Sequence, residues 1–133
     1  MLERMEGTRV VSTEEALDSM LSDPDWPTGR PTLRFAFDEL LTFGPLDDEL
    51  VKCRDPHAII TEEASFFGIK LSPEQGARLL EAHCEWAPPP LDRLPAQAQG
   101  AVAGVPTKIL FHQTHWLFVV QSPYVADFEE RVF

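Results

Sequence analysis

Apolar residues recur with helical spacing through the middle of the chain, and capping residues or glycine lie where the runs begin or end. The first run follows Asp55, a good N-cap residue, and stops at Gly68. The second run begins with a capping box from Ser72 to Gln75 and continues to Trp86. This pattern predicts two consecutive helices.

Shorter segments on either side also carry helical spacing. Ser12 or Thr13 is expected to cap a short helix that runs to residue 21, and a second short helix is expected over 45–51, each with acidic residues in its first turn. The segment 125–133 predicts a short amphipathic ending. The segment 32–44 satisfies both the helical and the strand period. Gly44 is a natural stop for a helix, so the helical interpretation is favoured.

A change in amino-acid composition separates these helices from the only strongly strand-like region, 107–121, which is rich in Ile, Phe, Trp and Val. That region predicts either one long strand or a hairpin that turns near His112–His115. The preceding stretch 88–106 is rich in Pro, Ala and Gly and predicts a long connection. The expected fold class is therefore α+β, a single helix-dominated small domain over 1–133 with a β-hairpin or long strand near its C-terminus.

Charge changes the picture from a generic small domain to an acidic one. The sequence has 22 acidic and 11 basic residues, a formal charge of −11, and most of the excess lies before residue 68. Such a field repels nucleic acid and anionic membranes, and it speeds encounter with basic partners. We therefore expect a basic protein partner, or a second copy of the chain in a homo-oligomer, with no direct nucleic-acid binding and no membrane binding.

One motif points in another direction. The segments Ile60-Thr61-Glu62-Glu63-Ala64 and Phe67-Gly68-Ile69, followed by Ser72, resemble the rhythm of helix-turn-helix DNA-binding modules. The resemblance implies a recognition helix that begins after Ser72. The exposed face of that helix carries three acidic side chains and one basic one, namely Glu74, Glu81, Glu85 and Arg78. Because phosphate repels such a face, the charges argue against DNA binding.

Cysteine and histidine residues are the candidates for metal or thiol chemistry. Cys53 and Cys84 are far apart in the sequence, which favours free thiols in a reduced, cytoplasmic protein. His112 and His115 are spaced as HxxH, and they are either two surface imidazoles or ligands that need a third donor. His83 points about 100° away from Cys84 on a helix, which disfavours a catalytic pair. No catalytic residue, cofactor or metal is predicted, and the chain is not expected to be an enzyme.

Acidic residues in two neighbouring segments are the candidate recognition surface, although solvated helix faces and caps would also explain them. The predicted binding residues are Asp47, Asp48, Glu49, Asp55, Glu62 and Glu63. The sequence thus predicts a small acidic binding protein: an inhibitor, immunity protein or antagonist of a basic partner, including one that itself binds nucleic acid. An alternative is a structural adaptor subunit of an oligomeric or phage-like assembly, in which the segment 109–120 pairs with a neighbour. A weaker alternative is an enzyme with a dispersed site.

Overall fold

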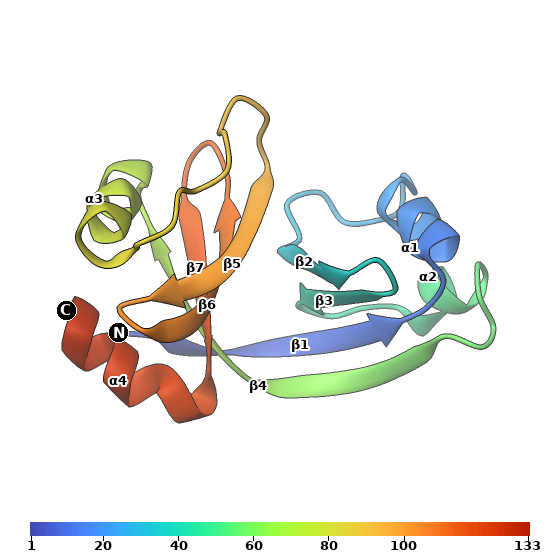
Figure 1. The fold of residues 1–133 in the computed structure, drawn as a ribbon. Coiled ribbons are helices and arrows are strands. Elements are labelled where there is room, and N and C mark those ends of the chain that lie inside the picture. The colour runs from blue at the N-terminus through green and yellow to red at the C-terminus, as the bar shows by residue number, and fades with distance from the viewer. The chain divides into compact units, whose positions relative to one another are not determined.

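The computed structural model describes all residues from 1 to 133, and strands dominate it (Figure 1). Strands hold 39% of the residues and helices 26%. The predicted helix-dominated α+β class is therefore wrong. The elements are β1 (Glu3–Val11), α1 (Glu14–Leu21), β2 (Thr32–Ala36), β3 (Glu39–Phe43), α2 (Asp48–Lys52), β4 (Ile59–Leu71), α3 (Pro73–His83), β5 (Ala96–Val102), β6 (Val105–Phe111), β7 (Trp116–Gln121), a short 3₁₀ turn (Ser122–Tyr124) and α4 (Val125–Val132).

Two compact units divide the chain, and each has its own hydrophobic core. The first, Met5–Ala64, is called the acidic unit below; its strands follow the order β2-β3-β1-β4. The second consists of Met1–Arg4 and Ser65–Phe133 and is called the C-terminal unit; its strands follow the order β4-β7-β6-β5. Strands β1 and β4 each contribute residues to both units. The single domain expected from the sequence stays a prediction.

Helix α1 forms in the acidic unit where the sequence predicts it. The Thr13 side chain accepts a hydrogen bond from the Ala16 N–H at 3.2 Å, which satisfies one of the unpaired donors of the first turn. Ala16, Leu17 and Met20 are buried along one face. They pack in a core with Val10 of β1 and other apolar residues.

The segment 32–44 forms strands β2 and β3, so its helical interpretation is wrong. The two strands pair antiparallel, and the Thr32 and Thr42 hydroxyls lie 3.0 Å apart across the pair. Leu40 through Phe43 are all buried, a continuous run that a helix with one apolar face would not bury. Strand β3 also pairs with β1, so its backbone is satisfied on both sides.

The helix predicted between Asp55 and Gly68 is also wrong, because the chain from Ile59 to Leu71 forms strand β4. Its C-terminal half pairs antiparallel with β7, from Phe66 opposite Gln121 to Leu71 opposite Trp116. Because the first helix of the helix-turn-helix resemblance is absent, that resemblance does not describe this fold. β-Branched and aromatic residues in the segment favour a strand once a partner is present.

Helix α3 of the C-terminal unit confirms the second predicted central helix, although it ends earlier than predicted. The Gln75 N–H donates to the Ser72 hydroxyl at 3.1 Å, and the Ser72 N–H donates to the Gln75 side-chain carbonyl at 3.0 Å. The helix ends at His83, and Trp86 lies beyond it. There the Trp86 indole N–H donates to the Ala101 carbonyl at 2.7 Å, on strand β5.

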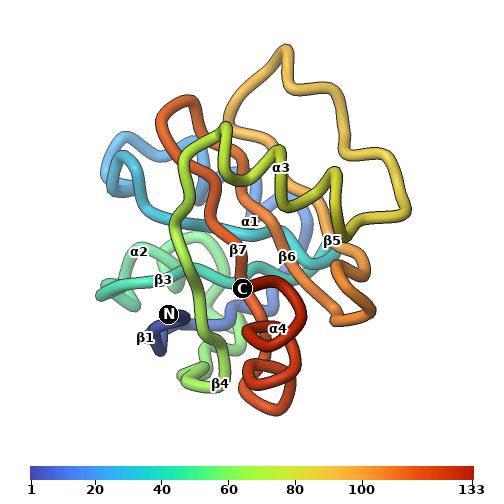
Figure 2. Tube along the Cα trace, turned by 90° about the vertical axis from the view of Figure 1, so that its left-hand side faces the viewer, coloured from blue at the N-terminus to red at the C-terminus, as the bar shows by residue number.

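Strands β6 and β7 form an antiparallel pair that turns over His112–His115, one of the two alternatives expected for this region. They lie side by side in Figure 1 and Figure 2. β6 lies between β5 and β7, and β7 lies between β6 and β4, so the segment 109–120 has no free strand edge. The stretch 88–106, expected as a connection, contains strand β5.

Helix α4 ends the chain as the amphipathic segment that the sequence predicts, with Phe128 fully buried. None of the helices has both the length and the apolar character needed to cross a membrane.

Candidate functional site

All six predicted binding residues belong to the acidic unit. That unit holds 14 acidic and five basic residues, so it carries −9 of the total formal charge of −11. Three of its arginines form internal ion pairs: Arg9 with Glu39 and Glu63, Arg34 with Asp18, and Arg54 with Asp23. Most of the negative charge is therefore left without an internal cation.

Three of the six predicted binding residues line a groove of about 670 Å³, which is called the acidic groove below. Asp48 reaches it from the first turn of α2, and Glu62 and Glu63 reach it from β4. Glu6 of β1 joins them, although it is not among the predicted binding residues. The full lining is Glu6, Gly7, Thr8, Gly44, Pro45, Leu46, Asp48, Ile60, Thr61, Glu62, Glu63 and Ala64, with no basic side chain among them.

The four carboxylates of the groove differ in how they are partnered. Glu63 accepts a hydrogen bond from Arg9 at 3.0 Å, and the same guanidinium binds Glu39 at 2.7 Å. Glu6, Asp48 and Glu62 have no such ion pair. These three are the carboxylates available to an incoming cation.

Two glycines shape the groove by letting backbone segments approach closely. A Cβ added at Gly7 would lie 3.1 Å from the Glu63 carbonyl oxygen, tighter than ordinary contact. Gly44 has φ of 101°, a conformation that favours glycine, and its N–H donates to the Glu6 carbonyl at 3.0 Å. The sequence signal for Gly44 is clear, but it marks a strand end and not the helix stop that we expected.

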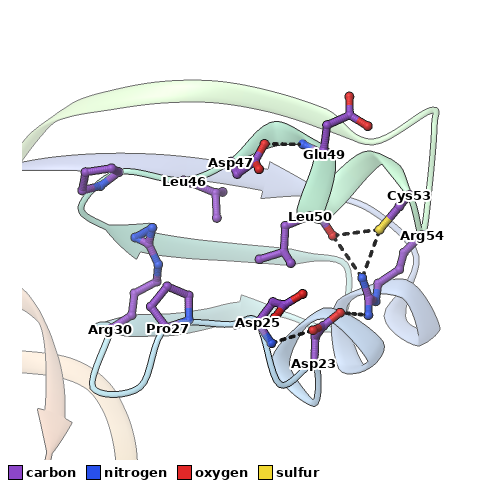
Figure 3. Close-up of a pocket in the computed structure, with 11 residues that line it drawn as sticks. Asp23, Asp25, Pro27, Arg30, Leu46, Asp47, Glu49, Leu50, Cys53 and Arg54 are labelled. Atoms are coloured by element: carbon purple, nitrogen blue, oxygen red, sulfur yellow. Dashed lines mark hydrogen bonds and ion pairs between the residues drawn. The ribbon is translucent and has the colours of Figure 1, made fainter.

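A second hollow of about 410 Å³ adjoins the groove at Pro45 and Leu46 and is called the Arg30 pocket (Figure 3). Its other lining residues are Asp23, Asp25, Pro27, Arg30, Asp47, Glu49, Leu50, Cys53 and Arg54. Two predicted residues, Asp47 and Glu49, therefore lie here. Figure 3 shows the Glu49 carboxylate turned away from Asp23 and Asp25.

One end of this pocket is closed by an ion pair between Asp23 and Arg54. The backbone N–H of Asp25, and then Arg54, hold the pKa of Asp23 below its ordinary value. Arg54 also donates to the Leu50 carbonyl at 3.3 Å and to the Cys53 sulfur at 3.1 Å. Its hydrogen-bonding capacity is thus largely used within the protein.

Asp47 and Asp55 have structural roles that the sequence did not assign fully. Asp47 is the N-cap of α2 and accepts a hydrogen bond from the Glu49 N–H at 3.0 Å, which confirms the short helix expected in that region. Asp55 caps no helix and lines neither hollow. It accepts hydrogen bonds from the Ser12 hydroxyl at 2.6 Å and the His57 N–H at 2.9 Å, and these lower its pKa.

The histidine and cysteine candidates are divided between the two units: Cys53 lines the Arg30 pocket, whereas Cys84, His112 and His115 belong to the C-terminal unit. The rings of His112 and His115 stack with centroids 4.7 Å apart. Burial, then His112 and Lys70, lower the pKa of His115. No group of three or more His, Cys, Asp or Glu side chains is arranged to hold a metal ion. Cys53 and Cys84 are free thiols.

No protein-family model and no characterised protein sequence matches this chain. Its structure is similar to a chain of the heterotetrameric sarcosine oxidase from Corynebacterium sp. U-96 in complex with pyrrole 2-carboxylate. The TM-score is 0.67 at 13% sequence identity, and the match covers 99% of this chain and 78% of that chain. A likeness at such low identity shows a shared fold alone.

Proposed function

We propose that this protein is a small binding protein whose acidic groove holds a basic segment of a partner protein. The supporting observation is convergence: acidic residues from three elements line one groove, namely Glu6 from β1, Asp48 from α2, and Glu62 and Glu63 from β4. The lining contains no lysine, arginine or histidine.

Both long-range and short-range electrostatics favour such a partner. The charge of −9 on the acidic unit attracts a basic protein at a distance and raises its association rate at low salt. In the groove, lysine or arginine heads reach the unpaired carboxylates. Their aliphatic stems pack against Leu46 and Ile60.

In this proposal the protein acts by binding and not by catalysis. Inhibition or antagonism of the partner is one consequence of covering a basic surface, because such surfaces are the ones that contact phosphates. The free thiols Cys53 and Cys84 fit a reducing cytoplasmic setting.

A labelled octa-lysine peptide tests the groove directly by fluorescence anisotropy at low and high salt. The variant Asp48→Asn with Glu62→Gln removes two groove charges. Losing two exposed ion pairs between the groove and the peptide, at roughly 0.7 kcal/mol each, should weaken the Kd about tenfold at low salt.

The matched control is Glu14→Gln with Glu15→Gln, which removes the same charge from the first turn of α1 in the same unit. We expect this control to bind with little change. Equal losses in both variants would reduce the effect to net charge, and no loss in the groove variant would refute the site.

The adaptor role remains the second candidate, with a different strand as its contact. Strand β5 pairs only with β6 and contains no charged residue and no proline, so its outer edge lacks the usual protection against strand pairing. The Trp86 indole lies against this strand at Gly100 and Ala101. Light scattering over a range of concentrations tests the role: self-association that Gln99→Lys abolishes would support it, and a monomer throughout would contradict it.

A further inference from the structure

We infer that the Arg30 pocket binds a small dipolar molecule, with a carboxylate that meets Arg30 and a protonated amine that meets Asp25. The pocket is a different hollow from the acidic groove, so this inference does not depend on the proposed function.

Arg30 is held in place but lacks an anionic partner. The only hydrogen bond of its guanidinium runs from Nη1 to the Phe43 carbonyl at 3.1 Å, although a guanidinium has five N–H donors. Its Nε is buried and has no hydrogen-bond partner. The guanidinium also lies over the Trp26 ring, 5.6 Å from the ring centroid. Arg30 is therefore a positioned cation with unused capacity for a carboxylate.

The contrast with the other arginines of the acidic unit strengthens this point. Arg9, Arg34 and Arg54 each form an ion pair with a carboxylate of the same unit. Arg30 forms none, even though acidic residues outnumber basic ones around its own pocket. Figure 3 shows why: Arg30 lies at one end of the pocket, and Asp23 and Asp25 lie at the other.

The opposite end of the pocket has carboxylate capacity to spare. The Asp25 side chain makes no hydrogen bond or ion pair within the protein, since only its backbone N–H is used. Asp47 lies on another wall beside Leu46 and uses one oxygen to cap α2 (Figure 3). Because Asp23 is already neutralised by Arg54, Asp25 is the group that meets an incoming cation.

This distribution of charge selects the class of ligand. A simple anion would meet Arg30 but would be repelled by the two carboxylates. A metal ion is disfavoured because the donors do not converge as a ligand set. A molecule with both charges satisfies both ends, and its aliphatic middle can lie against Pro27, Leu46 and Leu50. A volume of about 410 Å³ accommodates a molecule of amino-acid size.

Three probes of equal chain length separate the two charged ends. 6-Aminohexanoate carries both groups, hexylamine lacks the carboxylate, and hexanoate lacks the amine. Titration of the wild-type protein, followed by amide NMR shifts, should show 6-aminohexanoate binding about tenfold or more tightly than either analogue, with shifts centred on Arg30 and Asp25. If 6-aminohexanoate binds no more tightly than hexylamine and hexanoate, the inference is wrong.

Two variants then assign each end, and the wild-type comparison stands even if a variant fails to fold. Arg30→Gln should abolish the advantage of 6-aminohexanoate over hexylamine, whereas Lys52→Gln, the same charge change outside the pocket, should preserve it. Asp25→Asn should abolish the advantage over hexanoate, and Glu14→Gln should not. A folded Arg30→Gln protein that keeps the wild-type preference would overturn the assignment of Arg30.

Discussion

Replacing Gly76 with alanine tests how closely helix α3 packs on strand β7. Gly76 is buried in the helix and faces the indole of Trp116. A Cβ at this position would lie 3.0 Å from Cδ2 and 3.1 Å from Cζ3 of that indole, and Cε3 would be nearer still. The ring would have to retreat by at least about 0.5 Å to reach an ordinary carbon–carbon separation.

Two opposing terms set the size of the effect. In an open helix, glycine to alanine stabilises by about 1 kcal/mol. Overpacking a buried site costs about 1–3 kcal/mol, and Trp116 has little freedom to move because it is only 7% exposed and packs edge-on against Phe111 at 4.8 Å. Taking about 2 kcal/mol for the clash, we expect Gly76→Ala to lower the free energy of unfolding by about 1 kcal/mol.

Urea unfolding followed by far-UV circular dichroism measures this difference as a lower midpoint with an unchanged slope. Ala77→Gly, at the exposed neighbouring position, is the control and should lose about 1 kcal/mol from helix propensity alone. In a Trp116→Phe background the smaller ring should make Gly76→Ala neutral or stabilising. If Gly76→Ala alone stabilises the wild-type protein, α3 does not pack on Trp116 in this way.

Two further predictions concern hydrogen bonding and backbone conformation. Hydrogen bonds lower the folded-state pKa of Asp55, so its contribution to stability is present above the unfolded pKa, about 3.9, and is lost as pH falls through the folded pKa. Ser12→Ala should therefore raise the Asp55 pKa in an NMR titration and make the protein lose less stability in acid. An unchanged Asp55 pKa would contradict this role of Ser12. The β5–β6 turn contains Ala103 with φ of 52° followed by Gly104 with φ of 77°, so Ala103→Asn should raise the thermal unfolding midpoint, with about 0.5–1 kcal/mol of added stability. Ala101→Asn, within the strand, should not; equal effects at both positions would rule out the turn as the cause.

The elements that the sequence predicts correctly are those in which a few neighbouring residues decide the structure. The capping box at Ser72, the N-cap of α1 and the apolar face that includes Phe128 all depend on contacts within about one or two helical turns. Such contacts are encoded by spacing alone, and these elements appear where they are expected.

The errors lie where a distant partner decides between two local possibilities. Asp55 has the residue type of a helix cap, but its side chain is taken by Ser12, 43 positions earlier. The chain after it becomes a strand because β7, roughly fifty residues later, supplies a ladder of hydrogen bonds. The same holds at 32–44, where pairing with β1 decides between two periods that the sequence satisfies equally.

The candidate site shows the same division on a smaller scale. Three consecutive acidic residues form one patch in the sequence, but Asp48 lines the acidic groove while Asp47 and Glu49 line the Arg30 pocket. Successive side chains around a helix point about 100° apart, so adjacent residues at the start of α2 are directed to different surroundings. Glu6 reaches the same groove as Asp48 from strand β1. A run of like charge therefore indicates that a surface is acidic, whereas the elements that converge on it determine which of those charges can act on one ligand.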